Sequence, residues 1–147
     1  MGKVATAAVA AGGEVIGIIP DALVTKEASL VIADLRIVSS MHERKAKMAE
    51  LSDAFITLPG GFGTYEELSE ILTWAQLGLH RKPCGVLNVD GFYDPLFSMY
   101  DHAVAEGFIA KKHRSLVIVE DDIEVLLRRI ETYEPPKVEE WIDRSDT

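Results

Sequence analysis

The chain has 147 residues, 48% of them hydrophobic and 27% charged, a composition typical of a globular protein large enough to bury one core. Its formal net charge of −9 argues against nonspecific nucleic-acid binding, which needs a basic surface, but is compatible with a nucleotide in a local positive pocket. No apolar run is long enough to span a membrane, and the amino end shows no signal-peptide pattern, so we expect a cytoplasmic protein without a membrane partner. The single cysteine, Cys84, cannot form an internal disulfide and is expected to be a buried structural thiol.

Hydrophobic periodicity and breaker residues predict helices and strands that alternate along the chain. The first half contains a helix over residues 2–11, strands over 14–19 and 34–39, a helix over 41–51 and a strand over 53–58. The second half contains a helix over 63–76, a strand over 84–89, a helix from 94 to near 107, a strand over 115–119 and an amphipathic helix from 121. This alternation is typical of a parallel sheet with helices on both faces, so the predicted fold class is α/β with a doubly wound sheet. We expect a single domain over residues 1–136 and an acidic C-terminal tail over 137–147.

Cap residues support several of these boundaries. Gly12-Gly13 ends the first helix as a C-cap, and Ser40 is the predicted N-cap of the helix over residues 41–51. Asp94-Pro95 is a strong helix start, with the aspartate at the N-cap and the proline at the first helical position. The chain therefore opens on a helix, whereas α/β folds of this kind usually open on a strand.

The most informative segment is Pro59-Gly60-Gly61-Phe62-Gly63-Thr64-Tyr65-Glu66-Glu67, between an apolar strand and a helix. Its glycines let the backbone approach a ligand, while free N–H groups and the positive end of the helix dipole face an anion. In an open parallel sheet this turn lies at the carboxyl edge, where ligands bind. The run matches neither the dinucleotide fingerprint G-x-G-x-x-G nor the Walker ending G-K-[ST], so it favours a monophosphate or sugar phosphate. The alternative is purely structural, because Thr64 and Glu67 also match a capping box with Thr64 as the N-cap.

The helix over residues 41–51 carries a second candidate, Arg44, on the same face as Met41 and Met48. An inward guanidinium needs an anionic partner, because an unpaired buried charge is costly. The alternative is that Arg44 snorkels to solvent or pairs with a carboxylate of the protein itself. Lys45 lies on the flank next to Arg44. The histidines lack metal-ligand spacing with cysteines or carboxylates, so no metal is predicted.

Together, Met41-His42-Glu43-Arg44-Lys45-Ala46 and the glycine segment resemble the signature pair of the Lonely Guy family. These are cytokinin riboside 5′-monophosphate phosphoribohydrolases, often mislabelled as lysine decarboxylases, and their pattern P-G-G-x-G-T-x-x-E ends on Glu67. The resemblance continues through residues 12–17, 72–78 and 88–95 and covers nearly the whole chain to Pro136. It implies a Rossmann-like nucleotide-binding fold and a homodimer with sites near the subunit interface. It also implies cleavage of the N-glycosidic bond of a purine nucleoside 5′-monophosphate, without a cofactor, to free base and ribose 5-phosphate.

The resemblance also implies roles for particular residues. Glu67 would position or deprotonate water and stabilise an oxocarbenium-like sugar, as carboxylates do in glycoside cleavage. Arg44 would balance negative charge on the phosphate or the departing base. The implied substrate- and phosphate-binding residues are Glu27, Met41, Lys45, Gly60, Gly61, Phe62, Gly63, Thr64, Tyr65, Glu66 and Thr73.

Family members normally begin with a strand, a phosphate loop, a helix and a second strand that ends in a Gly-Gly-Gly turn. Met1-Gly2 coincides with the residues just after that turn, so the sequence is expected to lack the family's N-terminal β-α-β segment. Two other functions stay open: a non-catalytic monophosphate-binding module, and a general AMP nucleosidase with no requirement for an N6-modified base. Lysine decarboxylation is disfavoured, because it needs pyridoxal phosphate on a Schiff-base lysine, and no lysine here has a comparable setting.

Overall fold

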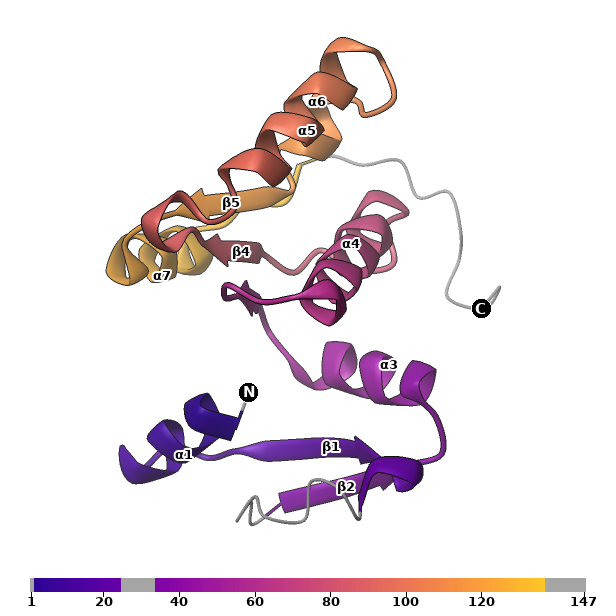
Figure 1. Cartoon of the computed structure of the whole chain (residues 1–147), viewed down its shortest axis with the longest axis vertical. Helices are drawn as coiled ribbons and strands as arrows, with labels where there is room; N and C mark the ends of the chain where they lie inside the picture. Colours follow the sequence, from indigo (N-terminus) through magenta and orange to yellow (C-terminus); the bar gives the residue numbers. More distant parts are fainter. Residues whose placement is uncertain (1, 25–33, 137–147) are drawn as a thin grey trace. The chain divides into compact units, whose positions relative to one another are not determined.

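The structure is a computed structural model that describes residues 2–24 and 34–136. The chain divides into two compact units, Met1–Ser52 and Asp53–Thr147, called the N-terminal and C-terminal units below. Each unit combines parallel strands with helices (Figure 1). The predicted α/β class with parallel strands flanked by helices is therefore confirmed, while the expectation of one domain over residues 1–136 stays a prediction.

The N-terminal unit contains α1 (Gly2–Ala10), β1 (Ile16–Pro20), η1 (Asp21–Leu23), β2 (Asp34–Val38) and α3 (Met41–Leu51). Helix α1 ends at the predicted cap, where Gly12 adopts a φ of 82° and the Gly13 N–H donates to the Ala8 carbonyl at 2.9 Å. Strands β1 and β2 pair in parallel, and α3 packs against them. Ser40 is the N-cap of α3, as predicted, because its hydroxyl accepts a hydrogen bond from the Glu43 N–H at 3.1 Å.

The C-terminal unit contains β3 (Phe55–Thr57), α4 (Phe62–Gln76), β4 (Cys84–Leu87), η2 (Val89–Gly91), α5 (Asp94–Ala105), α6 (Lys111–Arg114), β5 (Val117–Glu120) and α7 (Ile123–Glu131). Its three strands are parallel in the order β3-β4-β5 (Figure 1). All three carboxyl ends therefore meet at one edge of the sheet, which is where an open α/β sheet binds its ligands.

Helices cover both faces of this sheet. The core cluster lies on one face and consists of Leu68, Val86, Tyr93, Phe97 and Val117. Tyr93 directly precedes α5, and the other four residues come from α4, β4, α5 and β5. On the other face lies α7, whose Leu126 is completely buried. Gly85 makes room for this helix, because a Cβ at that position would lie 3.0 Å from side-chain carbons of both Leu126 and Ile130. Neighbouring residues of a strand point to opposite faces of the sheet. Val86 therefore faces the core cluster, and Gly85 faces α7.

The two helix starts lie close to where they were predicted, but neither Asp94, the predicted N-cap, nor Thr64, the N-cap of the alternative capping box, is the cap. Helix α4 begins at Phe62 with Gly61 as its N-cap, so Thr64 is not the cap but the third helical residue. Helix α5 has Tyr93 at the N-cap, and the Asp94 carboxylate accepts a hydrogen bond from the Asn88 amide at 2.7 Å instead of capping the helix. The short helix α6 was not predicted, because four polar residues carry no periodic apolar signal.

Other expectations have the following outcomes. Cys84 is buried, as predicted. Over residues 2–24 and 34–136, none of the helices combines the length and apolar character needed to cross a bilayer. The predicted acidic tail over 137–147 lies outside the described residues.

Candidate functional site

The glycine turn lies where predicted, between the carboxyl end of β3 and the start of α4. The first main-chain hydrogen bond of α4 is donated by the Tyr65 N–H to the Gly61 carbonyl, at 3.1 Å. Within the described part of the chain, the N–H groups of Phe62, Gly63 and Thr64 have no acceptor. These unpaired donors coincide with the positive end of the helix dipole, so the turn offers a backbone site for an anion.

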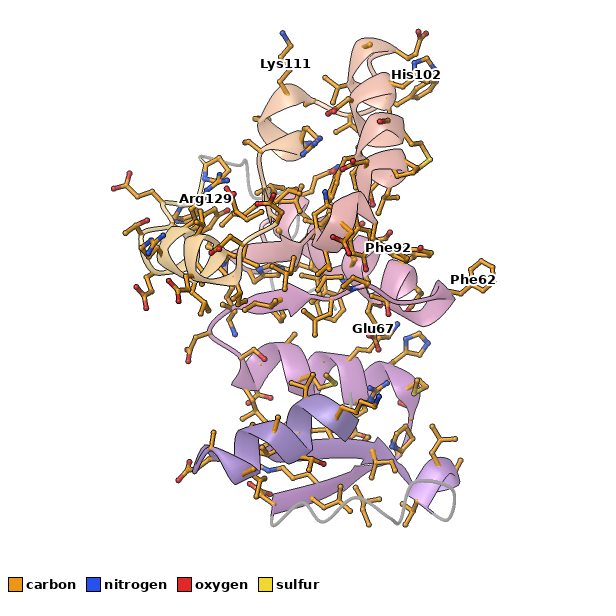
Figure 2. The ribbon with its side chains drawn as sticks, turned by 60° about the vertical axis from the view of Figure 1, so that its left-hand side comes forward. Phe62, Glu67, Phe92, His102, Lys111 and Arg129 are labelled. Carbon is orange, nitrogen blue, oxygen red and sulfur yellow. The ribbon has the colours of Figure 1, made fainter. Side chains whose placement is uncertain are left out.

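The turn is open at two of its glycines and closed at the third. No atom lies within 4 Å of the position that a Cβ would take at Gly61 or Gly63, so a ligand can approach the backbone there. A Cβ at Gly60 would lie only 2.2 Å from Thr64 Oγ1, which shows that the threonine side chain packs directly over this glycine. The Phe62 ring is 93% exposed and projects away from the ribbon (Figure 2).

Glu67 lies one helical turn beyond the open donors. It is three residues after Thr64 and four after Gly63, so the three share one face of α4. Glu67 is partly buried, and side chains on a helix lean in general toward its N-terminus, the end at which the turn lies. Glu66, by contrast, is exposed on an adjoining part of the helix surface. The backbone of Glu67 thus lies about 5 Å along the helix axis from the anion donors.

Two tyrosines, Tyr65 and Tyr93, pack against each other next to the turn. Tyr65 is partly buried, and its ring centroid lies 6.1 Å from that of Tyr93, with the rings nearly perpendicular at 82°. The Tyr93 hydroxyl donates a hydrogen bond to the Leu58 carbonyl at 2.7 Å. Burial raises the pKa of Tyr93, Tyr65 adds to the rise, and the Gly60 N–H opposes it. Sequence reasoning assigned Tyr93 no role, although it lies in the segment 88–95 that carries part of the family resemblance.

Three further candidates for substrate binding, Met41, Arg44 and Lys45, lie on α3 in the N-terminal unit. Arg44 and Lys45 are partly buried, whereas Met41 is 46% exposed and its sulfur lies 3.9 Å from Arg44 Nη1. No residue of α3 is fully buried. The Glu43 carboxylate accepts hydrogen bonds from the Ser39 hydroxyl and N–H at 2.6 and 2.7 Å, and these bonds lower its pKa.

The candidate Thr73 does not join the turn in the described structure. Thr73 is exposed on α4, and its hydroxyl donates to the Ser69 carbonyl at 2.7 Å. It lies ten residues after Gly63, which corresponds to about 15 Å along the helix axis. Glu27 lies outside the described residues.

Acidic side chains elsewhere along the carboxyl edge of the sheet make the glycine turn the more favourable place there for an anion. Beyond β4 and β5 the surface has an open depression, lined by Asn88, Gly91, Asp94, Val119, Glu120 and Asp121. Glu120 forms an ion pair with Arg129, but the neighbouring carboxylates make this depression unfavourable for a phosphate. In the part of the chain that the structure describes, no group of three or more acidic, histidine or cysteine side chains could hold a metal ion.

Fold and site together define an α/β protein with a glycine-rich, uncapped helix start at the carboxyl end of a parallel strand. A family model described as "Possible lysine decarboxylase" matches residues 1–130, and the chain belongs to this family. The resemblance to the Lonely Guy proteins that the two motifs predicted is likewise confirmed, because relatives that carry this name match most of the chain.

Three relatives illustrate the similarity. The chain is 52% identical over 136 residues to "Probable cytokinin riboside 5′-monophosphate phosphoribohydrolase LOGL9" of Oryza sativa subsp. japonica, covering 92% of this chain and 60% of that protein. It is 52% identical to the rice protein "Cytokinin riboside 5′-monophosphate phosphoribohydrolase LOG", covering 92% and 56%. It is 48% identical to the Arabidopsis thaliana protein of the same description, LOG7, covering 92% and 63%. The chain therefore spans about 60% of the length of the curated relatives that it matches.

Proposed function

We propose that this protein hydrolyses the N-glycosidic bond of a purine riboside 5′-monophosphate, releasing the free base and ribose 5-phosphate. The observation that carries the proposal is the alignment of open N–H groups at Gly63 and Thr64 with Glu67 on one face of α4. The names of the relatives support the substrate class, since they are cytokinin riboside 5′-monophosphate phosphoribohydrolases. The N6-substituted purine that this name implies is the substrate we propose for the present chain.

The 5′-phosphate would bind at the start of α4. The N–H groups of Phe62, Gly63 and Thr64 would donate to its oxygens, with the Thr64 hydroxyl beside them. In a nucleotide the phosphorus and the glycosidic carbon are separated by a chain of five bonds, a span comparable to one turn of helix. A carboxylate one turn beyond the phosphate donors is therefore suitably spaced for the glycosidic carbon.

Glu67 would act on the water that attacks this carbon. In the reaction the water oxygen bonds to C1′ while the C1′–N bond breaks, its electron pair goes to the base, and the proton that the water gives up ends on the base. A carboxylate can orient and deprotonate the water and stabilise the positive charge that develops on the sugar. This is the role we propose for Glu67.

The site needs positive charge from elsewhere, because a phosphate and a carboxylate repel each other. A helix N-terminus supplies only about half an elementary charge. We propose that Arg44 and Lys45 provide the rest, with Arg44 also stabilising the departing base. Met41, Tyr65, Glu66, Thr73 and Glu27 stay proposals for further substrate contacts. We also propose a cytoplasmic homodimer, and the exposed apolar side chains of Phe62, Met99 and Phe108 support a protein interface on the C-terminal unit.

The test is a chromatographic assay of base release from isopentenyladenosine monophosphate by the full 147-residue chain. Glu67→Gln should reduce release by about 10²- to 10⁴-fold while leaving nucleotide binding largely intact. Glu70→Gln is the matched control, because it makes the same change one turn further along α4 and should keep its activity. Equal release by parent and Glu67→Gln would remove Glu67 from the chemistry.

The same assay separates the alternatives. A parent chain that binds the nucleotide but releases no base would be a monophosphate-binding module. Equal turnover of AMP and of the isopentenyl derivative would indicate a general AMP nucleosidase.

A further inference from the structure

We propose that Tyr93 is a positioning residue for phosphate binding, because its hydroxyl fixes the conformation of the glycine turn. This inference rests on the proposed function, since it concerns the same anion site. Tyr93 lies 35 positions from Leu58 in the sequence, and its hydroxyl donates to the Leu58 carbonyl at 2.7 Å. This hydrogen bond ties the main chain to the core directly before Pro59, where the glycine turn begins.

The turn has little else to hold it. The parallel ladder of β3 ends at Thr57, and α4 begins at Phe62. Between them, within the described structure, Leu58 and Gly60 have no main-chain hydrogen bond to other backbone groups. Glycine-rich segments gain most from an external tether, because their backbone has the greatest freedom to lose.

Tyr93 itself is rigidly held. The side chain is fully buried, and its ring contacts those of Tyr65, Phe92 and Phe97, with the Phe92 centroid 4.9 Å away. Its own N–H donates to the Asn88 amide oxygen at 2.7 Å. The hydrophobic core therefore fixes the position of the hydroxyl, and the hydrogen bond to Leu58 restrains the turn relative to the core.

This arrangement predicts a specific effect on ligand recognition. The N–H groups of Phe62, Gly63 and Thr64 must point at the same phosphate to bind it together. A mobile turn must first be ordered, which lowers the affinity for the phosphate. Contacts to the base and sugar do not depend on these donors. Loss of the Tyr93 hydroxyl should therefore weaken binding of a nucleoside monophosphate and leave binding of the nucleoside unchanged.

The experiment measures the dissociation constants of AMP and adenosine by calorimetry for three full-length proteins: the parent, Tyr93→Phe and Tyr100→Phe. Tyr93→Phe keeps the ring in the core and removes only the hydroxyl. It should raise the AMP constant by about threefold to tenfold and leave that of adenosine unchanged. In turnover assays, KM for the monophosphate should rise more than kcat falls.

Tyr100→Phe is the matched control, because Tyr100 packs against the same core cluster and its ring lies 5.8 Å from that of Phe97. It should leave both constants unchanged. Incorporation of 4-aminophenylalanine at position 93, which restores a donor for the Leu58 carbonyl, should recover much of the AMP affinity. It also carries the test if Tyr93→Phe does not fold.

Equal weakening of AMP and adenosine in Tyr93→Phe, or no change in either, would overturn the proposal and leave Tyr93 as a core residue only. A parent protein that binds AMP no better than adenosine would refute the phosphate site, and the role of Tyr93 with it. The first result leaves the proposed function intact, so the two failures are distinguishable.

Discussion

Replacing Gly60 by alanine should destabilise the C-terminal unit, although the change adds only one methyl group. The new Cβ would lie 2.2 Å from Thr64 Oγ1 and 2.9 Å from Thr64 Cβ. Non-bonded carbon atoms prefer a separation of about 3.5–4.0 Å, so the second contact is also too close. Rotation of the threonine side chain can move the hydroxyl but not Thr64 Cβ, which is fixed by the helix. The turn must therefore widen.

Overpacking of this kind costs about 1–3 kcal/mol. With a urea dependence of about 1–3 kcal/mol per molar, the midpoint of unfolding should fall by roughly 1 M. The measurement is urea unfolding followed by tryptophan fluorescence in a Trp141→Phe background, where Trp74 on α4 is the only tryptophan left.

Gly63→Ala is the control, because no atom lies within 4 Å of its Cβ position and the residue is already helical. Alanine is favoured over glycine in a helix by up to about 1 kcal/mol, so this variant should be as stable as the parent or more stable. The two alanine substitutions are thus expected to have opposite signs although they lie three residues apart. If Gly60→Ala proved as stable as Gly63→Ala, the close packing of Thr64 over the turn would be refuted.

Two further predictions concern the core of the same unit. Leu126→Ala should lower the free energy of unfolding by about 2–5 kcal/mol, because the side chain is completely buried. Leu127 is 43% exposed, so Leu127→Ala should lower it by about 1 kcal/mol or less in the same urea-unfolding measurement. Similar losses for both would contradict the orientation of α7. Burial raises the pKa of Cys84 to about 12, so iodoacetamide at pH 8 should label the thiol only after unfolding, and rapid labelling of the native chain would contradict its burial. Because the thiol of the unfolded chain ionises near 9.0, stability should also fall as the pH rises from 9.0 towards 12, and Cys84→Ala should abolish that part of the slope.

Local signals in the sequence were sufficient for much of the fold. Helix α3 starts after Ser40 and α1 ends at Gly12, because a capping hydroxyl and a positive φ are properties of one or two residues. Helix α7 was predicted from its apolar spacing, and the structure shows that Asp122 caps it through a hydrogen bond from the Val125 N–H at 2.9 Å.

Failures of prediction occurred where distant residues decide the structure. The contact between Tyr93 and Leu58 joins two segments with different local patterns, and no periodicity or spacing in a single sequence indicates it. The N-cap of α5 differs from the prediction for a more local reason, because the Asn88 side chain engages both Asp94 and the Tyr93 N–H. The roles of Arg44 and Glu67 followed from the family motif, and they stay predictions.

The incorrect capping box explains why this helix start can serve as a site. Had Thr64 capped the helix, its hydroxyl would have occupied one of the N–H groups that an anion needs. With Gly61 at the cap position no side chain competes, and the donors of Phe62, Gly63 and Thr64 stay open. With glycine at position 61 the helix forgoes only a few tenths of a kcal/mol of capping energy relative to a serine or aspartate there. The turn instead obtains its stability from a distance, through the packing of Thr64 over Gly60 and the hydroxyl of Tyr93. Stabilisation by groups that leave the donors free is the feature that distinguishes a binding turn from an ordinary helix cap.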